Sequence, residues 1–367
     1  MRVRLGDYIK EYSVKNKNNE DIPVYSVSNS LGFCKDYFGK EVASKNKTTY
    51  KIVPRGCFAY NPSRINVGSV DWQNEEERVI VSPLYNVFSV SPLLDQQYLL
   101  YYLKSNVTLS RIRAVASGSV RDNLKLSMLY EFPIDLISLD QQYDVVSTLN
   151  AVQKIIDLYQ KGLSYLDELV RARFVEMFGD LRVNDKGWKY YKLDELTELI
   201  TDGEHATPKR TTQGIYLLSA RNVLNHQLSL EDVDYIDYDE FSRISRRIIP
   251  REGDVLISCS GSIGRCCVVP KNIKFQMVRS IALLRFKSNI NPVFAEYMIT
   301  SDYLQDQINK SKTASSQANL FQGKIKSLKG VVPPLELQNQ FASFVQEIDK
   351  SRLLSNHSLF LIKSITF

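Results

Sequence analysis

The sequence lacks long apolar runs, a cysteine framework and any signal for export. No stretch approaches the ~20 apolar residues that a membrane helix needs, and the start, Met1 to Leu5, lacks the apolar run of a signal peptide. The five cysteines are odd in number and unevenly spaced, which argues against a disulfide framework. We therefore expect a cytoplasmic protein with reduced thiols and no membrane contact.

Motifs for catalysis are missing as well. The phosphate-binding pattern Gly-x-x-x-x-Gly-Lys-(Ser/Thr) does not occur. The string nearest to the (Asn/Asp)-Pro-Pro-aromatic loop of adenine methyltransferases is Asn61-Pro-Ser-Arg64, which lacks the second proline and the aromatic residue. The three histidines are scattered, and Cys266-Cys267 has no Cys-x-x-Cys partner, so we expect no metal site. Gly261-Ser-Ile-Gly264 matches the Gly-x-x-Gly of an RNA-binding KH loop, without that domain's surrounding pattern.

Charge is present in moderate excess and is unevenly distributed. The chain has 367 residues, enough for two domains with their own cores, and a net charge of +6. Lysine and arginine outnumber acidic residues by 4 in 1–138 and by 4 in 180–334, whereas the balance is −2 in 139–179 and 0 in 335–367. A positive surplus in the two large units fits contact with phosphates. It is also common on proteins that touch no nucleic acid, so charge alone does not decide the function.

The strongest positive signal is an internal repeat. The segment 101–158 aligns with 297–354 without a gap, at an offset of 196 residues, and gives 11 identities in 58 positions. That is roughly three times the rate expected from average composition. A duplicated unit of this size is a domain, so we expect the same kind of binding surface twice. The matched pairs include Ser105/Ser301, Asn123/Asn319, Leu124/Leu320, Leu139/Leu335, Gln142/Gln338 and Leu158/Leu354.

A long helix is predicted over 140–178. No proline interrupts it, Ser138 with Gln141 forms a start signal, and Gly179 stands where a left-handed terminator belongs. Such a helix is roughly 58 Å long. Apolar residues follow the 4,3 spacing of a coiled-coil seam, namely at Val145, Leu149, Val152, Ile156, Tyr159, Leu163, Leu166 and Val170.

A second, shorter helix is predicted over 335–367. Pro333-Pro334 opens it, with proline at the first helical position, and its seam weakens at Arg352 and Ser355. If two copies of one domain are related by a pseudo-two-fold axis, these helices pack antiparallel and hold the domains apart as a spacer. The alternative is that each helix packs only on its own domain.

Short strands and small-residue loops make up the two large units. We expect strands near 52–60 and 248–257, apolar strands at 79–90 and 280–286, helices near 98–104 and 294–299, and loops at 116–123 and 313–319. Equivalent loops differ in residue while the frame around them matches. Two copies that present different specificities would show this pattern.

Side chains in these loops are of the types that can contact DNA. Base edges are read by Arg, Lys, Asn, Gln, Ser and Thr, and phosphates take Arg, Lys, hydroxyls and backbone amides. For any one residue the alternative is turn chemistry or a solvated charge, and Tyr60 at a strand end fits the core or its rim better than a stacking platform. The candidates are Tyr60, Asn61, Ser63, Arg64, Asn66, Ser117, Ser119, Arg121 and Asn123 in the first unit, and Thr207, Lys209, Arg210, Arg221, Asn222, Ser260, Ser262, Arg265, Ser315, Ser316, Gln317 and Asn319 in the second.

Together these segments resemble the specificity subunit of a Type I restriction-modification system. The resemblance covers nearly the whole chain and is carried by five segments in order, which are Asn61-Pro-Ser-Arg-Ile-Asn-Val-Gly68, Ser138-Leu-Asp-Gln-Gln142, 169–180, Ile200-Thr-Asp-Gly-Glu-His-Ala-Thr-Pro208 and Pro333-Pro-Leu-Glu-Leu-Gln338. Two departures are the missing Pro-Pro before the first helix and the end of the last helix soon after Ile365.

The resemblance implies an α/β (α+β) protein with two pseudo-repeated target recognition domains. These would be residues 1–138 and 180–334, separated by long antiparallel coiled-coil-like helices at 139–179 and 335–367, with pseudo-two-fold symmetry. It further implies a non-catalytic reader of double-stranded DNA that binds two methyltransferase subunits and is joined by restriction/translocase subunits. S-adenosylmethionine, ATP and Mg would belong to those partners, with no cofactor in this chain.

The expected function is therefore recognition of a bipartite, asymmetric DNA site with a gap of fixed length. Two alternatives stay open at this point. One is the reader subunit of a related combined restriction-methylation system that cuts near its site. The other, from a different class, is a duplicated scaffold or RNA-binding protein.

Overall fold

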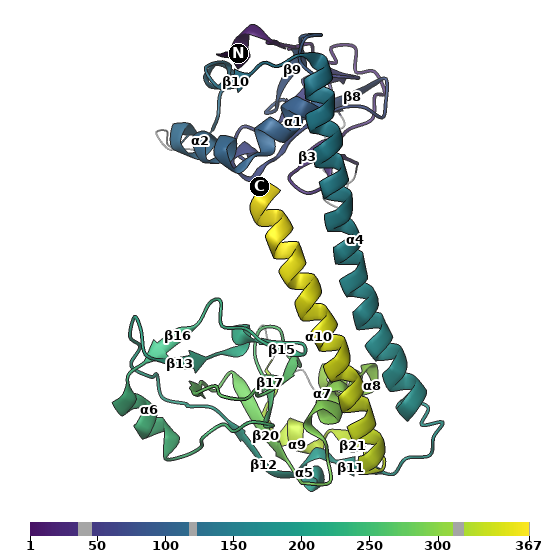
Figure 1. Cartoon of the computed structure of the whole chain (residues 1–367), viewed down its shortest axis with the longest axis vertical. Helices are drawn as coiled ribbons and strands as arrows, with labels where there is room; N and C mark the ends of the chain where they lie inside the picture. The colour runs from purple at the N-terminus through teal and green to yellow at the C-terminus, as the bar shows by residue number, and fades with distance from the viewer. Residues whose placement is uncertain (36–45, 117–122, 311–318, 367) are drawn as a thin grey trace. The chain divides into compact units, whose positions relative to one another are not determined.

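The computed structural model describes residues 1–35, 46–116, 123–310 and 319–366. It divides the chain into two compact units. Unit 1 comprises Met1–Gln160 and His357–Phe367, and unit 2 comprises Lys161–Asn356. Each unit mixes helices and short strands, as predicted, and each contains part of the two long helices α4 (Leu139–Phe178) and α10 (Leu335–Thr366), drawn teal and yellow in Figure 1.

Unit 1 is built on a four-stranded antiparallel sheet in the order β2-β9-β6-β7. The predicted continuous strand over 79–90 is wrong, because the chain turns at Ser82–Tyr85, where the N–H of Tyr85 donates to the carbonyl of Ser82 at 3.0 Å. Pro83 favours this turn, since it has no N–H for a sheet ladder. The strands are β1 (Arg2–Arg4), β2 (Ile9–Glu11), β3 (Ser26–Ser28), β4 (Gly32–Cys34), β5 (Lys51–Pro54), β6 (Phe58–Tyr60), β7 (Val70–Trp72), β8 (Arg78–Val81), β9 (Asn86–Val90) and β10 (Pro133–Asp135).

Aromatic side chains on the sheet and leucines on a helix form the core of unit 1. Phe58 and Phe88 stack with their ring centroids 5.1 Å apart, and Leu99 and Leu103 of α1 belong to the same buried cluster. Asp95 caps α1 by accepting the N–H of Tyr98 at 2.8 Å, which fixes where the helix begins. Besides α4, the helices are α1 (Gln96–Lys104), α2 (Asn106–Ala116), α3 (Leu126–Tyr130) and the 3₁₀ turns η1 (Leu5–Asp7) and η2 (Ile65–Val67).

Unit 2 repeats the four-stranded sheet in the equivalent order β12-β20-β17-β18. It adds a three-stranded sheet, β16-β13-β19, in which β13 and β19 are parallel, and a short hairpin, β14-β15. The strands are β11 (Tyr190–Lys192), β12 (Thr197–Asp202), β13 (Ile215–Leu218), β14 (Val223–Leu224), β15 (Gln227–Leu228), β16 (Asp234–Ile236), β17 (Val255–Ser258), β18 (Cys266–Val268), β19 (Phe275–Met277), β20 (Ile281–Phe286) and β21 (Lys329–Val331).

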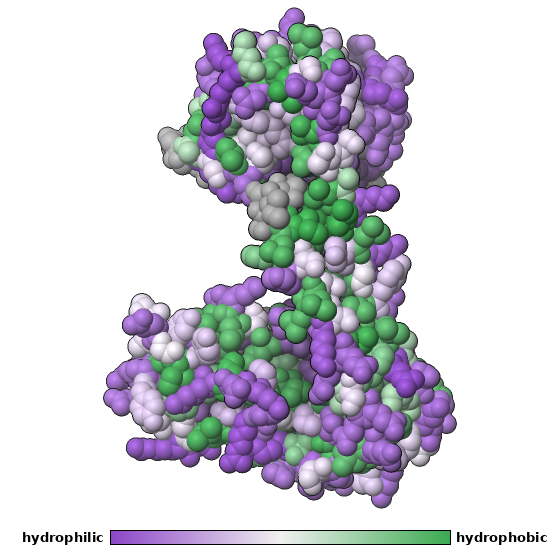
Figure 2. Space-filling view, in the orientation of Figure 1, coloured by the Kyte–Doolittle hydropathy of each residue, from purple (hydrophilic) through white to green (hydrophobic). Residues whose placement is uncertain are grey.

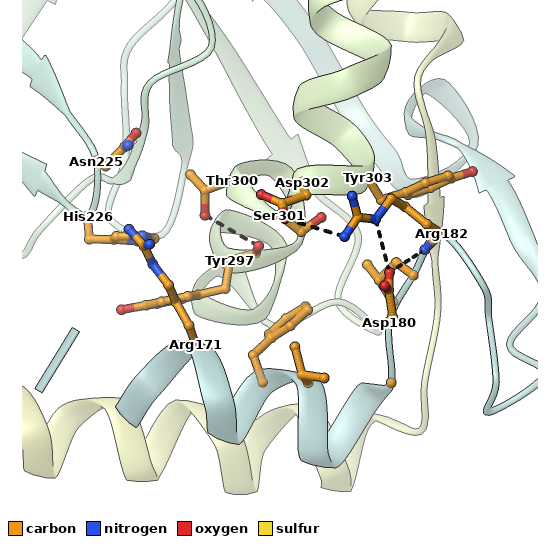
Figure 3. Close-up of a pocket in the computed structure, with 14 residues that line it drawn as sticks. Arg171, Asp180, Arg182, Asn225, His226, Tyr297, Thr300, Ser301, Asp302 and Tyr303 are labelled. Atoms are coloured by element: carbon orange, nitrogen blue, oxygen red, sulfur yellow. Dashed lines mark hydrogen bonds and ion pairs between the residues drawn. The ribbon is translucent and has the colours of Figure 1, made fainter. Parts of the chain in front are cut away.

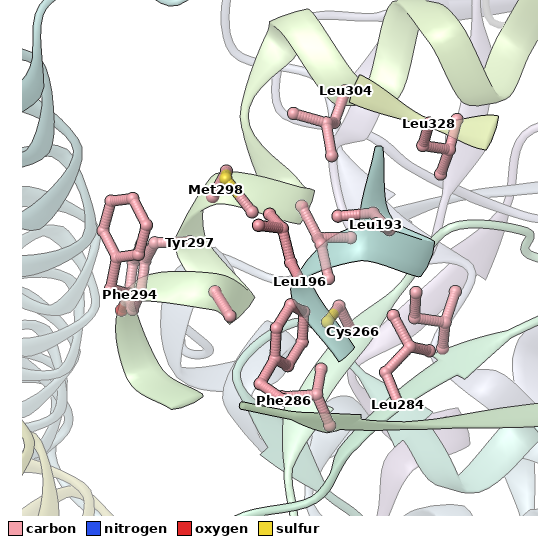
Figure 4. Close-up of a cluster of buried hydrophobic side chains, with 14 of the residues drawn as sticks. Leu193, Leu196, Cys266, Leu284, Phe286, Phe294, Tyr297, Met298, Leu304 and Leu328 are labelled. Carbon is pink, nitrogen blue, oxygen red and sulfur yellow. The ribbon is translucent and has the colours of Figure 1, made fainter. Parts of the chain in front are cut away.

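The core of unit 2 joins its sheet to both long helices. Figure 4 shows Leu193 and Leu196 beside Leu284 and Phe286 of the sheet, with Phe294 on a neighbouring helix. The ring of Phe294 lies 5.9 Å from Phe174 and 4.7 Å from Phe178 of α4, and Phe341 of α10 joins the same aromatic cluster. The remaining helices are α5 (Leu193–Leu196), α6 (Tyr238–Ser245), α7 (Pro292–Thr300), α8 (Asp302–Lys310), α9 (Gln322–Ser327) and the 3₁₀ turn η3 (Ala220–Asn222).

The internal repeat extends to individual hydrogen bonds. In unit 1 the buried side chain of Gln142 accepts the N–H of Asp95 at 2.8 Å and donates to the carbonyls of Leu93 and Ile137 at 3.0 and 2.9 Å. Unit 2 forms the same three bonds 196 residues later, between Gln338 and Asn291, Asn289 and Pro333 at 2.8, 3.3 and 2.8 Å. The duplication inferred from the sequence is thus visible as one frame built twice.

The ends of α4 agree with the predicted signals. The Oγ of Ser138 accepts the N–H of Gln141 at 3.3 Å, and the Gln141 side chain accepts the N–H of Ser138 at 3.2 Å, which completes a capping box. Gly179 has a φ of +78°, the left-handed conformation that ends a helix. The opening of α10 differs slightly from the prediction: Pro334 precedes the first helical residue and accepts the N–H of Gln338 at 3.2 Å through its carbonyl.

Within unit 2 the two long helices pack antiparallel. The rings of Phe174 and Phe341 lie 5.4 Å apart, and Asp167 accepts a hydrogen bond from Arg352 at 2.6 Å, so the contacts advance along α4 and recede along α10. Val145 is exposed, whereas the other predicted seam positions of α4 are buried or half-buried. Among the described helices, none is both long enough and apolar enough to cross a membrane.

Candidate nucleic-acid interface

The predicted loop after β6 is a preformed turn in unit 1. The Oδ1 of Asn61 accepts the N–H and the hydroxyl of Ser63 at 3.1 and 2.9 Å, an arrangement typical of an Asx turn. Gly68, with a φ of +87°, ends the following 3₁₀ turn. Arg64 is exposed, and its side chain makes no hydrogen bond or ion pair within the described ranges of the chain. Asn61 and Arg64 line one small hollow of about 40 Å³.

The remaining candidates of unit 1 fall into three groups. Asn66 and Asn123 are half-exposed, and the N–H of Leu124 donates to the carbonyl of Pro62 at 3.0 Å, which places Asn123 beside the Asx turn. Tyr60 is fully buried, and its hydroxyl donates to the carbonyl of Leu124 at 3.1 Å, so it belongs to the core rather than to a surface that reads DNA. Outside the described residues lie Ser117, Ser119 and Arg121.

The loop after β17 gives unit 2 an equivalent turn. The hydroxyl of Ser258 donates to the carbonyl of Ser262 at 2.6 Å and accepts the N–H of Arg265 at 3.0 Å. This leaves Ser262 exposed and Arg265 half-exposed. Ser260 forms an isolated β-bridge with Asn319, which brings two predicted loops together. Outside the described residues lie Ser315, Ser316 and Gln317.

In the loops that precede and follow β13, some of the candidate side chains are free to contact DNA and others are already paired within the protein. Thr207 and Lys209 are exposed. The guanidinium groups of Arg210 and Arg221 both pair with Asp234, at 3.0 and 3.1 Å, so carboxylates of the protein already engage them.

Asn222 is a correction to the predicted interface. It is 1% exposed, accepts the N–H of Ser219 at 2.9 Å and donates to the carbonyls of Ser229 and Asp232 at 3.1 and 2.8 Å. Its amide closes the loop and has no free edge to offer DNA.

A hollow of about 400 Å³ in unit 2 contains Ser260 and Asn319 together with residues that the sequence alone did not single out. It is formed by the end of β12, the end of β17, the start of β20 and the residues before α9, four segments that are distant in the chain. The signal that could have found Phe321 is the repeat itself, which pairs it with Lys125 inside the matched segment. Arg279 lies before that segment, and the same offset of 196 residues pairs it with Pro83. The missed residues are Asp202, His205, Arg279, Phe321 and Gln322.

A separate hollow of about 320 Å³ adjoins the end of α4 and holds none of the predicted residues (Figure 3). The ring of His226 stacks on Tyr297 at 4.0 Å, and its Nδ1 lies 3.4 Å from the carboxylate of Glu296. Burial raises the pKa of Glu296. His226 lies in the turn of the β14-β15 hairpin, where its φ is +62°. Because Glu296 and Tyr297 belong to α7, these contacts hold the hairpin against that helix.

The placement of the possible metal ligands and of the cysteines can be read directly from the described residues. No three His, Cys, Asp or Glu side chains come together as metal ligands in the part of the chain that the structure describes. All five cysteines are unpaired, and four of them are buried. Burial raises the pKa of the Cys259 thiol to about 12 and that of Cys266 well above its usual range. The four buried cysteines therefore pack as small apolar residues.

Polar side chains dominate the visible surface of the two compact units, whereas apolar ones gather along the long helices (Figure 2). On α10, Leu353, Leu354 and Phe360 are 69%, 72% and 67% exposed. Exposed apolar side chains that lie close together are typical of a surface that binds another molecule.

Comparison with protein families identifies one domain type twice. The model of the Type I restriction modification DNA specificity domain matches residues 4–166 and again 185–362. The two matches together span most of the chain and agree with the internal repeat.

Individual relatives point in the same direction. A type I restriction enzyme specificity subunit of Haemophilus influenzae is 24% identical over 288 residues, which cover 72% of this chain and 66% of the relative. The type I restriction enzyme MjaX specificity subunit of Methanocaldococcus jannaschii is 25% identical over 170 residues, which cover 44% of this chain and 39% of the relative. The chain thus spans less than two thirds of the length of each.

Solved structures share the fold. A chain from a structure of type I R-M system assembly and conformational transition superimposes with a TM-score of 0.63 at 15% identity, covering 100% of this chain and 95% of the other. The Type-I restriction-modification S subunit from M. genitalium gives a TM-score of 0.52 at 14% identity, covering 100% and 93%.

Proposed function

Because this chain belongs to the Type I restriction modification DNA specificity family, we propose that it reads a bipartite, asymmetric DNA site, one half-site with each compact unit. The observation that carries the proposal is that the two units share the same backbone framework and hydrogen bonds but differ in their loops. Gln142 and Gln338 make the same three bonds. The loops set on that frame differ, with an Asx turn at Asn61 in one unit and a serine-rich turn at Ser258 in the other.

Differences between the loops support asymmetry of the site. Arg64 and Arg265 stand in equivalent loops, yet the residues around them are unlike, so the two units offer different donor and acceptor patterns. Since the major groove presents a distinct pattern for each base pair, unlike loops select unlike half-sites. The helix α4, with 40 residues, is about 60 Å long and supports a gap of fixed length between them.

The exposed apolar residues of α10 support the second part of the proposal, that the long helices bind methyltransferase subunits. Burying Leu353 and Leu354 against a partner would each contribute about 1.5 to 3 kcal/mol. In this arrangement S-adenosylmethionine is bound by the methyltransferase, and ATP and Mg by the restriction subunits that join it. The chain itself supplies sequence recognition and transfers no methyl group.

The test is methylation by the assembled complex. The chain is combined with the methyltransferase subunit from the same source, and a randomised DNA library is methylated and sequenced. We expect two short, different half-sites separated by a gap of fixed length and arbitrary sequence. A single continuous site, or methylation by the chain without its partner, would contradict the proposal.

A further inference from the structure

The hollow of unit 2 is lined by two charged side chains, Arg279 and Asp202. Arg279 is exposed, and its side chain makes no hydrogen bond or ion pair with any residue in the described ranges. Its backbone is fixed nevertheless, because its N–H donates to the carbonyl of Glu204 at 3.0 Å. An arginine with an anchored backbone and an unengaged guanidinium is ready to contact a ligand.

Asp202 lines the same hollow and brings the opposite chemistry. Its carboxylate lies 3.2 Å from the Nε2 of His205 and 4.0 Å from the guanidinium of Arg247, and the side chain remains about a quarter exposed. The neighbouring carbonyl of Gly203 accepts a hydrogen bond from Arg247 at 3.1 Å, which fixes the backbone where β12 ends. The guanidinium of Arg279, which donates hydrogen bonds, and the carboxylate of Asp202, which accepts them, therefore line the same hollow.

This pair of groups distinguishes a base pair from a phosphate. A phosphate diester has no hydrogen-bond donor, so the carboxylate of Asp202 would gain no hydrogen bond from it. A G·C pair has complementary groups in the major groove, since guanine offers the O6 and N7 acceptors that arginine binds with two hydrogen bonds, and cytosine offers an N4 donor that a carboxylate accepts.

Unit 1 shows that this chemistry belongs to one unit only. In both units the frame is the same, because the N–H of Leu320 donates to the carbonyl of Cys259 at 2.9 Å as that of Leu124 does to Pro62 at 3.0 Å. The position of Arg279 is nevertheless taken by Pro83 in unit 1. An arginine in unit 2 and a residue without a side-chain donor at the equivalent position of unit 1 would give the two units different half-sites.

We propose that this hollow reads one G·C pair of the half-site bound by unit 2, with Arg279 contacting guanine and Asp202 contacting the amino group of cytosine. The inference rests on the proposed function and adds the identity of one base pair and the residues that select it. Phe321, 59% exposed at the rim, is placed to contact the neighbouring nucleotide.

The experiment measures binding of the assembled complex to a randomised half-site library, using the full chain and its methyltransferase subunits. We compare the unaltered protein with Arg279→Ala, Arg279→Lys and Asp202→Asn, and use Lys271→Ala as a control that removes one exposed positive charge of unit 2 outside the hollow. The unaltered protein should require G·C at one position. Arg279→Ala should reduce that preference roughly tenfold or more at this position alone, and Asp202→Asn should relax the same position.

Other outcomes overturn the inference in distinguishable ways. Equal weakening on all sequences with a shallower salt dependence would make Arg279 a phosphate contact. An unchanged preference in Arg279→Ala, with thermal unfolding as in the unaltered protein, would remove Arg279 from recognition. If the unaltered complex itself shows no sequence preference, the proposed function fails, and this inference fails with it.

Discussion

Single residues set the frame on which the loops stand, and the buried glutamines show how. Each of Gln142 and Gln338 is fully buried, and its side-chain amide pairs with one backbone N–H and two backbone carbonyls. A buried polar group that loses its partner costs more free energy than the hydrogen bond itself contributes. The amide is therefore required for the junction between each domain and its long helix.

Replacing Gln338 by leucine tests this role. The change keeps the helix-forming character of the side chain but leaves the N–H of Asn291 and the carbonyls of Asn289 and Pro333 without their partner. We expect the free energy of unfolding to fall by about 2 to 4 kcal/mol, measured by chemical denaturation. Gln340→Leu, at an exposed position of the same helix, should change it little.

Arg64 tests the interface of unit 1 at the same scale. Its side chain has no partner among the described residues, so Arg64→Ala should leave stability unchanged. Binding of the half-site should weaken by about 1 to 3 kcal/mol, with relaxed discrimination at one position, if the arginine reads a guanine. Titrations on the preferred site and on single-base variants at two salt concentrations measure this, with Lys10→Ala as the charge control. A loss that is the same for every variant would assign Arg64 to a phosphate.

Among the elements, the pairing of α4 with α10 in unit 2 combines apolar and ionic contacts. The seam predicted to weaken at Arg352 is occupied there by a side chain only 18% exposed, which bonds to Asp167 of α4 and to Asp349 at 2.6 and 2.7 Å. An ion pair of this kind fixes register more than it adds stability. The apparent defect in the apolar pattern is thus a specific contact between the two helices.

A double-mutant cycle on Arg352→Gln and Asp167→Asn measures that contact. We expect a coupling free energy of about 1 to 2 kcal/mol, because the pair is partly buried and short. The same cycle on Lys271 and Glu252, a pair 3.4 Å apart whose side chains are both exposed, should give a value near zero. Equal coupling in the two pairs would show that partial burial adds nothing here.

Local chemistry explains which elements were predictable from the sequence. The ends of α4 were predicted correctly because a capping box and a left-handed glycine lie within a few residues of the ends that they define. The break between β8 and β9 was missed, although Pro83 marks it, because the apolar pattern on both sides is continuous. Asn222 was placed on the interface because its residue type suits DNA, whereas its burial depends on segments far away in the chain. Tyr60 was included among the candidates although its place at a strand end favoured the core, where it lies. The hollow around Arg279 was missed for the same reason.

At the scale of the whole molecule, each half should act as a separate reader. Exchanging residues 1–138 for the equivalent segment of a homologue should change one half-site and leave the other intact. The physical reason is that the loops of unit 1 and the frame that holds them belong to the same unit. Sequencing of methylated DNA from cells that carry the chimera gives the result. A chimera in which both half-sites change would contradict the modular interpretation.

The bonds of Gln142 and Gln338 also have a genetic consequence. Each glutamine lies in the first turn of its long helix. Its partners lie just before α1 or α7 and just before the long helix itself, and the earliest of them are Leu93 and Asn289. A crossover between two genes upstream of Leu93 would therefore deliver new loops onto a junction whose polar groups are already satisfied. The two halves of one gene encode the same junction, so a crossover between them would also keep its hydrogen bonds. Selection could then test new pairs of half-sites in a single step, without first repairing the fold.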